Sequence, residues 1–209
     1  MRILLIRHGR SAHVSPGGLL DRVAIERWRT AYDASGIVDD CHPPAALVAE
    51  VARADAVAAS DLPRAIASAQ RLAPGREVAV SPLFREVPLP IPASAVLRAP
   101  FAAWGTLIYL RWAADLLLHR HPAADARERA RAAAAWCREA CLGAAPGSAV
   151  AVVTHGAFRR MLAQRLVAEG WRREGGRGYA HWSVWRFAAP DRAPSHDRRA
   201  SASTATPPR

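Results

Sequence analysis

Two histidines, each followed directly by a glycine, are the residues of this sequence whose type and setting best fit a reaction. His8 belongs to the tripeptide RHG at residues 7–9, and His155 belongs to THG at residues 154–156. Each follows a short apolar run, which predicts a buried strand that ends in a polar loop. An imidazole there can attack an electrophile, carry a proton or, once cationic, hold an anion. A single histidine after a strand is more often structural, so the pair is what indicates a site.

Two arginines extend this set toward phosphate chemistry. Arg7 directly precedes His8, and Arg64 lies in a predicted helix that follows another short strand. Guanidinium groups are permanently charged forks that match the oxygens of a phosphate group. A phosphomonoester carries close to two negative charges, which must be neutralised before a nucleophile approaches phosphorus. If the strands are neighbours, two imidazoles and two guanidinium groups therefore meet at one edge of the sheet.

The elements that must position these residues alternate along the chain. Apolar, β-branched runs predict strands, and apolar residues at helical spacing predict helices between them. This alternation predicts an α/β fold: a three-layer α/β/α sandwich with a mostly parallel central sheet, which gathers ligands beyond the carboxyl ends of its strands. The expected strands span residues 2–6, 56–59, 78–80, 148–153 and 181–187, and the expected helices span residues 21–34, 43–51, 63–72, 101–119, 123–142 and 157–169.

We expect residues 1–189, almost the whole chain, to form one domain. The segment from Pro82 to Pro100 contains five prolines, which exclude a continuous helix or a central strand there. We expect this connection and the two helices after it to form a small helical cap, inserted at about residues 87–145. From residue 190 on, proline, serine, arginine and alanine show no core pattern, which predicts a disordered tail over residues 190–209.

The composition limits the classes of protein that fit. The chain has 209 residues, of which 51% are hydrophobic and 22% charged, as is typical of a globular protein. No apolar run has the length of a membrane span, and the start, MRILLI, is too short for a secretory signal, so we expect a cytoplasmic protein. The three cysteines form no paired framework and predict free thiols. The net charge of +11 attracts polyanions, but all 29 basic residues are arginines, many beside acidic residues in predicted helices, so nucleic acid is not an expected partner.

Four segments resemble, in their order and separation, the histidine phosphatase superfamily, the phosphoglycerate mutase-like group. The resemblance spans residues 1 to about 188 and rests on LLIRHGRS at 4–11, SDLPRAIASAQ at 60–70, LFRE at 83–86 and VVTHG at 152–156. It implies a phosphohistidine on His8 that water later hydrolyses, which is covalent catalysis in two steps.

The expected roles divide between one histidine that attacks and groups that bind. His8 must stay neutral at the attacking nitrogen, so its other ring nitrogen must hold a proton against a backbone carbonyl or a similar acceptor. A cationic His155 would stabilise the charge of the phosphoryl oxygens in the transition state. The hydroxyl of Ser11 can either bind an oxygen of the substrate or fix its own loop. The residues expected to bind the substrate phosphate are Arg7, Arg64, Ser11 and Gly156.

The leaving oxygen must receive a proton, and Glu86 is the candidate acid. It lies in LFRE, where the family usually keeps its acidic residue, and it would later act as the base that activates water. The alternative is a rim glutamate paired with Arg85. Asp61 is a second candidate acid, although its place before a helix favours a helix cap. Because arginines neutralise the phosphate, we expect no metal ion and no cofactor.

The sequence favours a phosphomonoester hydrolase that acts on a small phosphorylated metabolite. Sugar-phosphate mutases of the family usually carry asparagine six residues after the nucleophile, where this chain has Val14, and VPLPIP replaces the mutase-type run after the acidic residue. Mutase-type phosphoryl transfer and a non-catalytic phospholigand-binding protein stay as alternatives, as does a homo-oligomer beside a monomer. His13 either contacts the substrate or has no duty in its loop. The residues that either line a pocket or belong to the core are Trp104, Tyr109, Arg111 and Trp112.

Overall fold

The computed structural model describes residues 1–94, 96–118, 123–142 and 148–190. The predicted tail, apart from residue 190, lies outside the described residues. None of the described helices is long and apolar enough to span a membrane. The elements are, in order, β1 (Arg2–Arg7), α1 (Arg22–Ala34), α2 (Ala45–Ala52), β2 (Ala56–Ser60), α3 (Pro63–Leu72), β3 (Ala79–Ser81), the short 3₁₀ helix η1 (Pro82–Phe84), α4 (Phe101–Leu117), α5 (Ala123–Leu142), β4 (Ala149–Thr154), α6 (Gly156–Ala168), β5 (Arg172–Gly175) and β6 (Val184–Ala188).

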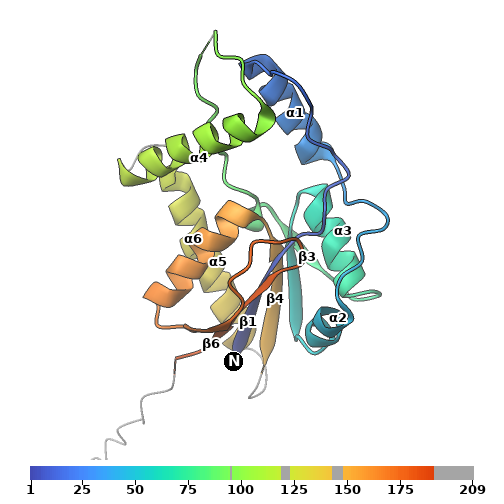
Figure 1. Ribbon diagram of the computed structural model, residues 1–209. Helices are drawn as coiled ribbons and strands as arrows, with labels where there is room; N and C mark the ends of the chain where they lie inside the picture. Colours follow the sequence, from blue (N-terminus) through green and yellow to red (C-terminus); the bar gives the residue numbers. More distant parts are fainter. Residues whose placement is uncertain (95, 119–122, 143–147, 191–209) are drawn as a thin grey trace, which may run out of the picture.

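Six strands form one sheet in the order β3-β2-β4-β1-β6-β5. The first four in this order are parallel, whereas β6 pairs antiparallel with β1, and β5 pairs antiparallel with β6. Helices cover both faces of this mostly parallel sheet (Figure 1). The predicted α/β sandwich is therefore confirmed.

The two central strands are buried on both faces, which explains their continuous apolar runs. Residues 3–6 of β1 are at most 1% exposed, and residues 150–153 of β4 are fully buried. One face packs against α5 and α6, and the other packs against α2 and α3. Because each buried aliphatic side chain contributes roughly 1.5–3 kcal/mol, this packing fixes the position and register of the two strands.

The helix α5 belongs to the sandwich and not to a cap. It packs against α6 and β4, and its alanines at 126, 130, 133 and 134 are at most 3% exposed. Such small side chains let a helix approach its neighbours closely, so an alanine-rich segment suits the layer over the sheet. The predicted cap of about residues 87–145 therefore does not hold for α5.

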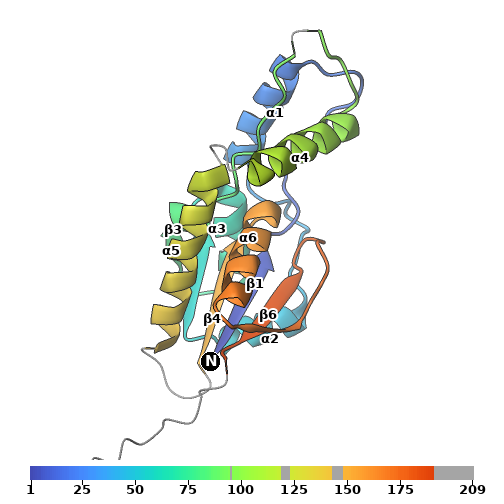
Figure 2. The ribbon, with the colours of Figure 1, turned by 90° about the vertical axis from the view of Figure 1, so that its left-hand side faces the viewer.

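The helices α1 and α4 lie beyond the carboxyl ends of the strands (Figures 1 and 2). A separate apolar cluster that includes Ile25 and Trp104 joins them. The indole N–H of Trp104 donates to the Leu20 carbonyl at 2.8 Å, and Leu20 forms a short antiparallel bridge with Ala99. Trp104 is thus a core residue, and so is Trp112, which packs in the main cluster. The cap is built from α1 and α4.

The chain after α6 departs most from the predicted elements. The glycine-rich segment, predicted as a turn, contains the edge strand β5, and the last strand begins at Val184 instead of residue 181. β5 is largely exposed and has no apolar alternation, so its sequence carries no strand signal. Residues 181–183 form a loop in which Trp182 has a φ of 61°, a left-handed conformation that bulky residues rarely adopt.

This loop packs against the residues that follow β1. A Cβ built on Gly9 would lie 2.4 Å from Cζ2 of Trp182, so only glycine fits there. The indole N–H of Trp182 donates to Sγ of Cys41 at 3.0 Å, which holds the ring in place. The contact between Gly9 and Trp182 therefore joins the loop of His8 to the loop before β6.

We expect Gly9→Ala to lower the free energy of unfolding by about 1–3 kcal/mol, because the new methyl group must displace the indole ring or the backbone. Urea unfolding followed by tryptophan fluorescence measures the change. Gly17→Ala is the control, since a Cβ there meets nothing within 4 Å, and it should change stability by less than about 0.5 kcal/mol. Equal stability of Gly9→Ala and the unmodified protein would contradict the packing described.

Candidate functional site

The register of β1 against β4 brings the two histidines together. Arg7 pairs with Thr154 in the parallel ladder, so His8 and His155 leave neighbouring strands at the same level. The backbone N–H of His8 donates to the Thr154 carbonyl at 3.1 Å, and the two imidazole centroids lie 5.0 Å apart. Two residues from opposite ends of the chain therefore form one pair at the carboxyl edge of the sheet.

His8 has the protonation state and orientation that a nucleophile needs. Its Nδ1 lies 2.7 Å from the Gly9 carbonyl oxygen, which can only accept, so the ring proton is assigned to Nδ1 and the lone pair to Nε2. Burial, with the charges of Arg64 and Arg7 acting in the same direction, lowers the pKa of His8 to about 3 despite the hydrogen bond to Gly9. The ring is therefore uncharged at neutral pH, and Nε2 can attack.

His155 is fully buried and neutral in the protein alone. The hydroxyl of Ser60, at the end of β2, lies 2.8 Å from Nε2 of His155 and accepts the N–H of Leu62 at 3.2 Å. We assign the serine as the donor to Nε2, because its hydroxyl proton has no other acceptor among the described residues, and this puts the ring proton on Nδ1. Burial lowers the pKa of His155 well below its usual value, and His8 and Arg64 act in the same direction. A cationic His155 therefore requires a bound anion to offset these positive charges.

Arg64 is held by the C-terminal end of α1. Its buried guanidinium group donates to the Tyr32 carbonyl at 2.9 Å and to the Asp33 carboxylate at 3.1 Å. The group also lies 4.1 Å from the centroid of the Tyr32 ring, which is a cation–π contact. These contacts use the two terminal nitrogens and leave Nε without a partner among the described residues. The cap helix α1 therefore orients the arginine whose charge acts on both histidines.

Arg7 is held by the loop before β6. One terminal nitrogen donates to the Tyr179 carbonyl, whereas Nε is buried and has no partner within the described part of the chain. Gly156, the first residue of α6, flanks this nitrogen, because a Cβ at Gly156 would lie 4.0 Å from it. The positive end of the α6 dipole and the guanidinium group of Arg7 are therefore neighbours, which favours an anion between them.

Arg159 belongs to the surroundings of the site and was missed by the sequence analysis. It is fully buried and donates to the carbonyls of Ser183 at 2.7 Å and Gly178 at 3.0 Å, and it lies 4.1 Å from the ring centroid of Trp185. Burial and the charge of Arg7 lower the pKa of Arg159 to about 10. These bonds fix the loop that holds Arg7. Helical spacing alone could not show that an arginine of α6 faces inward.

Three residues whose charge or ring acts on His8 have a buried nitrogen without a partner among the described residues. These nitrogens are Nε of Arg7, Nε of Arg64 and Nδ1 of His155. Such groups are rare in folded proteins, since each costs about 1–3 kcal/mol when it is left unsatisfied. An oxyanion that accepts from all three would satisfy them and offset the local positive charge. The described residues contain no group of three or more histidine, cysteine or acidic side chains that could hold a metal ion.

Glu86 is bound to the N-terminus of α6. Its Oε1 accepts the N–H groups of Phe158 at 2.8 Å and Val87 at 2.9 Å, and its Oε2 accepts the N–H of Ala157 at 3.3 Å. The alternative of a Glu86–Arg85 ion pair is wrong, because Arg85 pairs with the carboxylate of Asp61 at 2.6 Å. The expected helix cap at Asp61 is wrong for the same reason, and α3 has Leu62 at its N-cap position.

The remaining predicted residues lie around this centre. The hydroxyl of Ser11 accepts the N–H of His13 at 3.2 Å, so Ser11 fixes its own loop, and its contact with a phosphate stays a prediction. The His13 ring lies 5.7 Å from the Trp28 ring. Tyr109 of α4 is half-exposed, and burial together with the charge of Glu86 raises its pKa. Arg111 pairs instead with Asp115 of its own helix.

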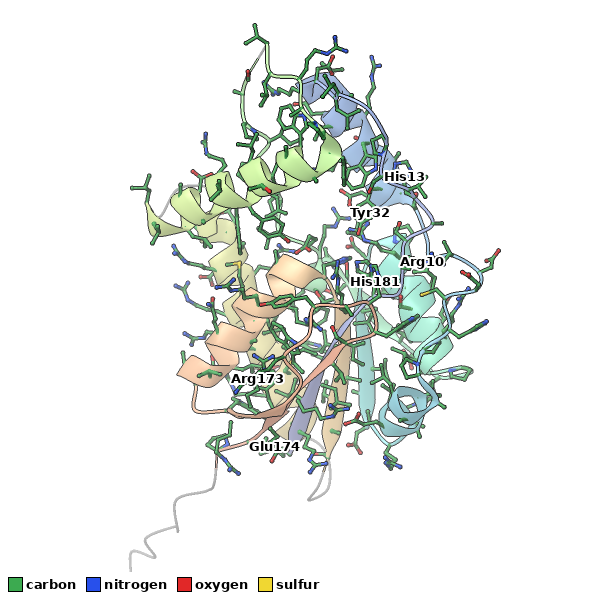
Figure 3. All side chains as sticks on the ribbon, in the orientation of Figure 1. Arg10, His13, Tyr32, Arg173, Glu174 and His181 are labelled. Carbon is green, nitrogen blue, oxygen red and sulfur yellow. The ribbon has the colours of Figure 1, made fainter. Side chains whose placement is uncertain are left out.

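A third imidazole, that of His181, was not predicted at the site. Its ring centroid lies 5.8 Å from that of His8, and it comes from the loop before β6. Figure 3 places His181 and Arg10 at the carboxyl end of the sheet, below Tyr32, which lies at the end of the cap helix α1. The sequence analysis assigned residue 181 to a strand, which hid its place in a loop at the site.

A family model described as histidine phosphatase superfamily (branch 1) matches residues 3–192. The chain belongs to this superfamily. Three solved structures resemble it: mycobacterial hydrolase 2 (20% identity, 90% of this chain and 89% of that chain covered, TM-score 0.55), the protein of open reading frame Rv3214 from Mycobacterium tuberculosis (19%, 90% and 96%, 0.51) and mycobacterial hydrolase 1 (18%, 90% and 97%, 0.50). They support the fold. No curated protein matches the sequence.

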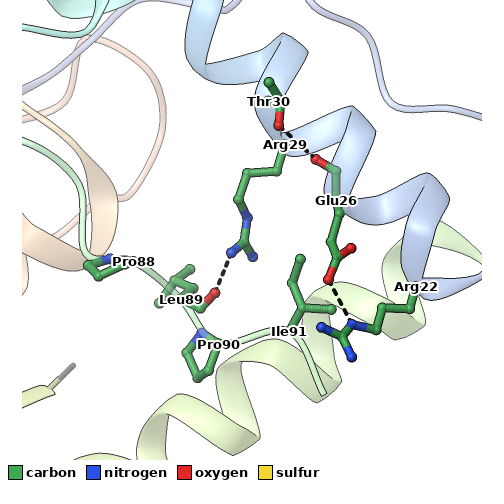
Figure 4. A pocket seen from close by; sticks show the side chains of 8 residues that line it. All are labelled: Arg22, Glu26, Arg29, Thr30, Pro88, Leu89, Pro90 and Ile91. Carbon is green, nitrogen blue, oxygen red and sulfur yellow. Dashed lines mark hydrogen bonds and ion pairs between the residues drawn. The ribbon is translucent and has the colours of Figure 1, made fainter. Parts of the chain in front are cut away.

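The proline-rich segment after Glu86 packs against α1. Residues 88–91 and the face of α1 from Arg22 to Thr30 line an open cavity of about 410 Å³ (Figure 4). Arg29 donates across it to the Leu89 carbonyl at 2.5 Å. The segment therefore braces the helix that holds Arg64, and the cavity contains none of the residues that surround His8.

The buried histidines predict a stability that falls in acid. Their pKa values in the folded protein lie below 6.5, so the unfolded chain binds protons first as the pH falls. Stability is therefore complete above pH 6.5 and declines from there toward the folded-state pKa of about 3 for His8. Each histidine adds a slope of up to about 1.4 kcal/mol per pH unit.

Urea unfolding across this pH range measures how the free energy of unfolding changes per pH unit. His8→Gln should reduce this slope by the contribution of one histidine. The same substitution at the exposed residue His42, His42→Gln, is the matched control. A slope that is the same with and without His8 would show that His8 is not buried in its neutral form.

Proposed function

We propose that this protein is a phosphomonoester hydrolase that acts on a small phosphorylated metabolite through a phosphohistidine on His8. The observation that supports this most is the set of unpartnered N–H groups on Arg7, Arg64 and His155 around a neutral imidazole. A phosphate group supplies the acceptor oxygens and the negative charge that this arrangement needs. Membership of the histidine phosphatase superfamily supports the same reaction class.

In the first step the phosphate of the substrate would accept hydrogen bonds from Arg7, Arg64 and His155. Its negative charge would raise the pKa of His155, so that this ring becomes the cationic donor that stabilises the transition state. Nε2 of His8 then attacks phosphorus, and the bond between phosphorus and the leaving oxygen breaks. The arginines supply the neutralising charge, so the proposed reaction uses no metal ion.

The leaving oxygen would take its proton from Glu86. Of the two carboxylate oxygens, Oε2 has a single long contact at 3.3 Å and is therefore the one that can carry a proton. Protonation of the leaving group matters most for alkyl phosphates, whose alkoxides are strong bases. In the second step water attacks the phosphohistidine, releases inorganic phosphate and restores the neutral His8.

Two segments with few polar side chains favour hydrolysis over mutase-type transfer. Val14, six residues after the nucleophile, is 80% exposed and offers no polar group to hold a phosphoryl acceptor. The segment after Glu86 packs against α1 through Pro88 to Ile91 and likewise presents few polar side chains. Water is then the natural acceptor of the phosphoryl group.

We expect His8→Ala to abolish the release of phosphate from an aryl phosphate, with a loss of at least about 10³-fold in kcat, because the nucleophile is gone. Orthovanadate should inhibit the unmodified protein, since its oxyanion fits the same donors. Acid-labile, alkali-stable radiolabel from a ³²P-substrate should appear on the unmodified protein and on His42→Ala, and not on His8→Ala. Full turnover by His8→Ala would contradict the proposal.

Glu86→Gln and Asp61→Asn should separate the two candidate acids. We expect Glu86→Gln to lower kcat for an alkyl phosphate about 10²–10⁴-fold and to affect p-nitrophenyl phosphate much less, because nitrophenolate leaves without a proton. Asp61→Asn breaks an exposed ion pair with Arg85 and should change kcat less than about fivefold. Steady-state kinetics with both substrates measure this, and a larger effect of Asp61→Asn would reverse the assignment.

A further inference from the structure

We propose that His181 is the base that accepts a proton from the attacking water when the phosphohistidine on His8 is hydrolysed. This step rests on the function proposed above, and it gives the second half of the reaction to a residue other than Glu86. Four observations carry it: the place of the ring, its exposure, its charge state and the hydrogen bonds already made by Glu86.

The antiparallel direction of β6 brings His181 to the reacting histidine. β6 pairs with β1, so the start of β6 lies beside the end of β1, at the carboxyl edge of the sheet. The N–H of Trp182 donates to the Arg7 carbonyl at 3.2 Å, which fixes the neighbouring residue against β1. The His181 ring lies 5.8 Å from the His8 ring, only slightly farther than His155. His181 and His155 therefore both adjoin the ring that would carry the phosphoryl group.

Of the three imidazoles, His181 is the one that water can reach. His8 is 2% exposed and His155 is fully buried, whereas His181 is exposed. Attack on phosphorus occurs opposite to the bond with Nε2, and since the floor of the site is buried, the attacking water must enter from the solvent side. No hydrogen bond joins the His181 ring nitrogens to another residue in the ranges that the structure describes. One ring nitrogen is thus available to accept a proton.

The charges around His181 keep its ring neutral before the reaction. The groups that face it are His8 and Arg7 from the end of β1 and Arg10 from the loop that follows. Burial lowers the pKa of His181, and Arg7 and Arg10 act in the same direction. A neutral imidazole can accept a proton, and the negative phosphoryl group then stabilises the imidazolium that forms.

Glu86 is poorly placed to act as this base. Its Oε1 already accepts two backbone N–H groups, and its Oε2 accepts a third, all at or beside the N-terminus of α6. These three N–H groups already occupy lone pairs on both carboxylate oxygens, which leaves fewer positions for the attacking water than the unpartnered ring nitrogens of His181 offer. The ring nitrogens of His181 make no hydrogen bond to another described residue.

The proposed step balances in atoms and charge. The oxygen of water forms a bond to phosphorus, the bond between phosphorus and Nε2 breaks, and its electron pair returns to Nε2 of His8. One proton of water moves to His181, and the product leaves as hydrogen phosphate. His181 then releases its proton to solvent. The carboxylate of Glu86 takes up a proton from solvent, which replaces the proton that it gave to the leaving oxygen.

Rapid quench with p-nitrophenyl phosphate tests the step, because this substrate phosphorylates His8 without help from an acid. For His181→Gln we expect a burst of nitrophenol equal to the enzyme concentration, accumulation of phosphohistidine, and a kcat at least about 10²-fold lower than in the unmodified protein. His181→Ala should behave alike, and added imidazole should restore its turnover, which also shows that the variant is folded. Glu86→Gln should show no accumulation of phosphohistidine with this substrate, and His42→Gln should match the unmodified protein.

Two results would overturn the proposal. One is a His181→Gln variant with unchanged kcat. The other is a variant that loses phosphorylation and turnover in parallel, which would make His181 a binding group for the substrate. If the unmodified protein itself forms no phosphohistidine, the proposed function fails and this step fails with it, so the two failures are distinguished by the labelling of the unmodified protein.

Discussion

Parallel pairing of β1 with β4 is the constraint on which the site depends. The ladder pairs Arg7 with Thr154, and the residues that follow them are the two buried histidines. Side chains alternate between the faces of a strand, so a slip of one residue would send one imidazole to the opposite side and separate the pair. The aliphatic residues of both strands are buried on both faces, and a slip would also disturb this packing. The same core that stabilises the fold therefore sets the distance between the histidines.

The second feature of the molecule is positive charge that is buried with little negative charge beside it. Arg64 has one carboxylate, that of Asp33, and Arg159 is held by backbone carbonyls and by the face of Trp185. Burial of charge is unfavourable unless hydrogen bonds or opposite charges offset it, so part of this cost persists until an anion binds. The positive charge that is not offset favours binding of a dianion and the neutral, nucleophilic form of His8.

Much of this arrangement is predictable from sequence, and the exceptions have physical causes. Continuous aliphatic runs predict the strands that precede His8 and His155, and the tripeptides RHG and THG mark the ends of these strands. The place of α5 was misjudged because alanine suits an exposed helix and a tightly packed one equally well. His181 and Arg159 were missed because their positions follow from β6 being antiparallel and from the loop that α6 holds, and neither contact is local in sequence. The bonds of Glu86 to the start of α6 are equally non-local.

The central claim is that His8 and His155 are both neutral in the protein alone and share one oxyanion when it binds. Nitrogen-15 spectra of the histidine side chains, recorded against pH with and without orthovanadate, test it most directly. The account predicts that at neutral pH His8 is the tautomer protonated at Nδ1 and stays uncharged far below pH 6.5, and that vanadate shifts both rings and makes His155 cationic. A His8 that titrates near 6.5, or a vanadate that leaves His155 unchanged, would contradict it.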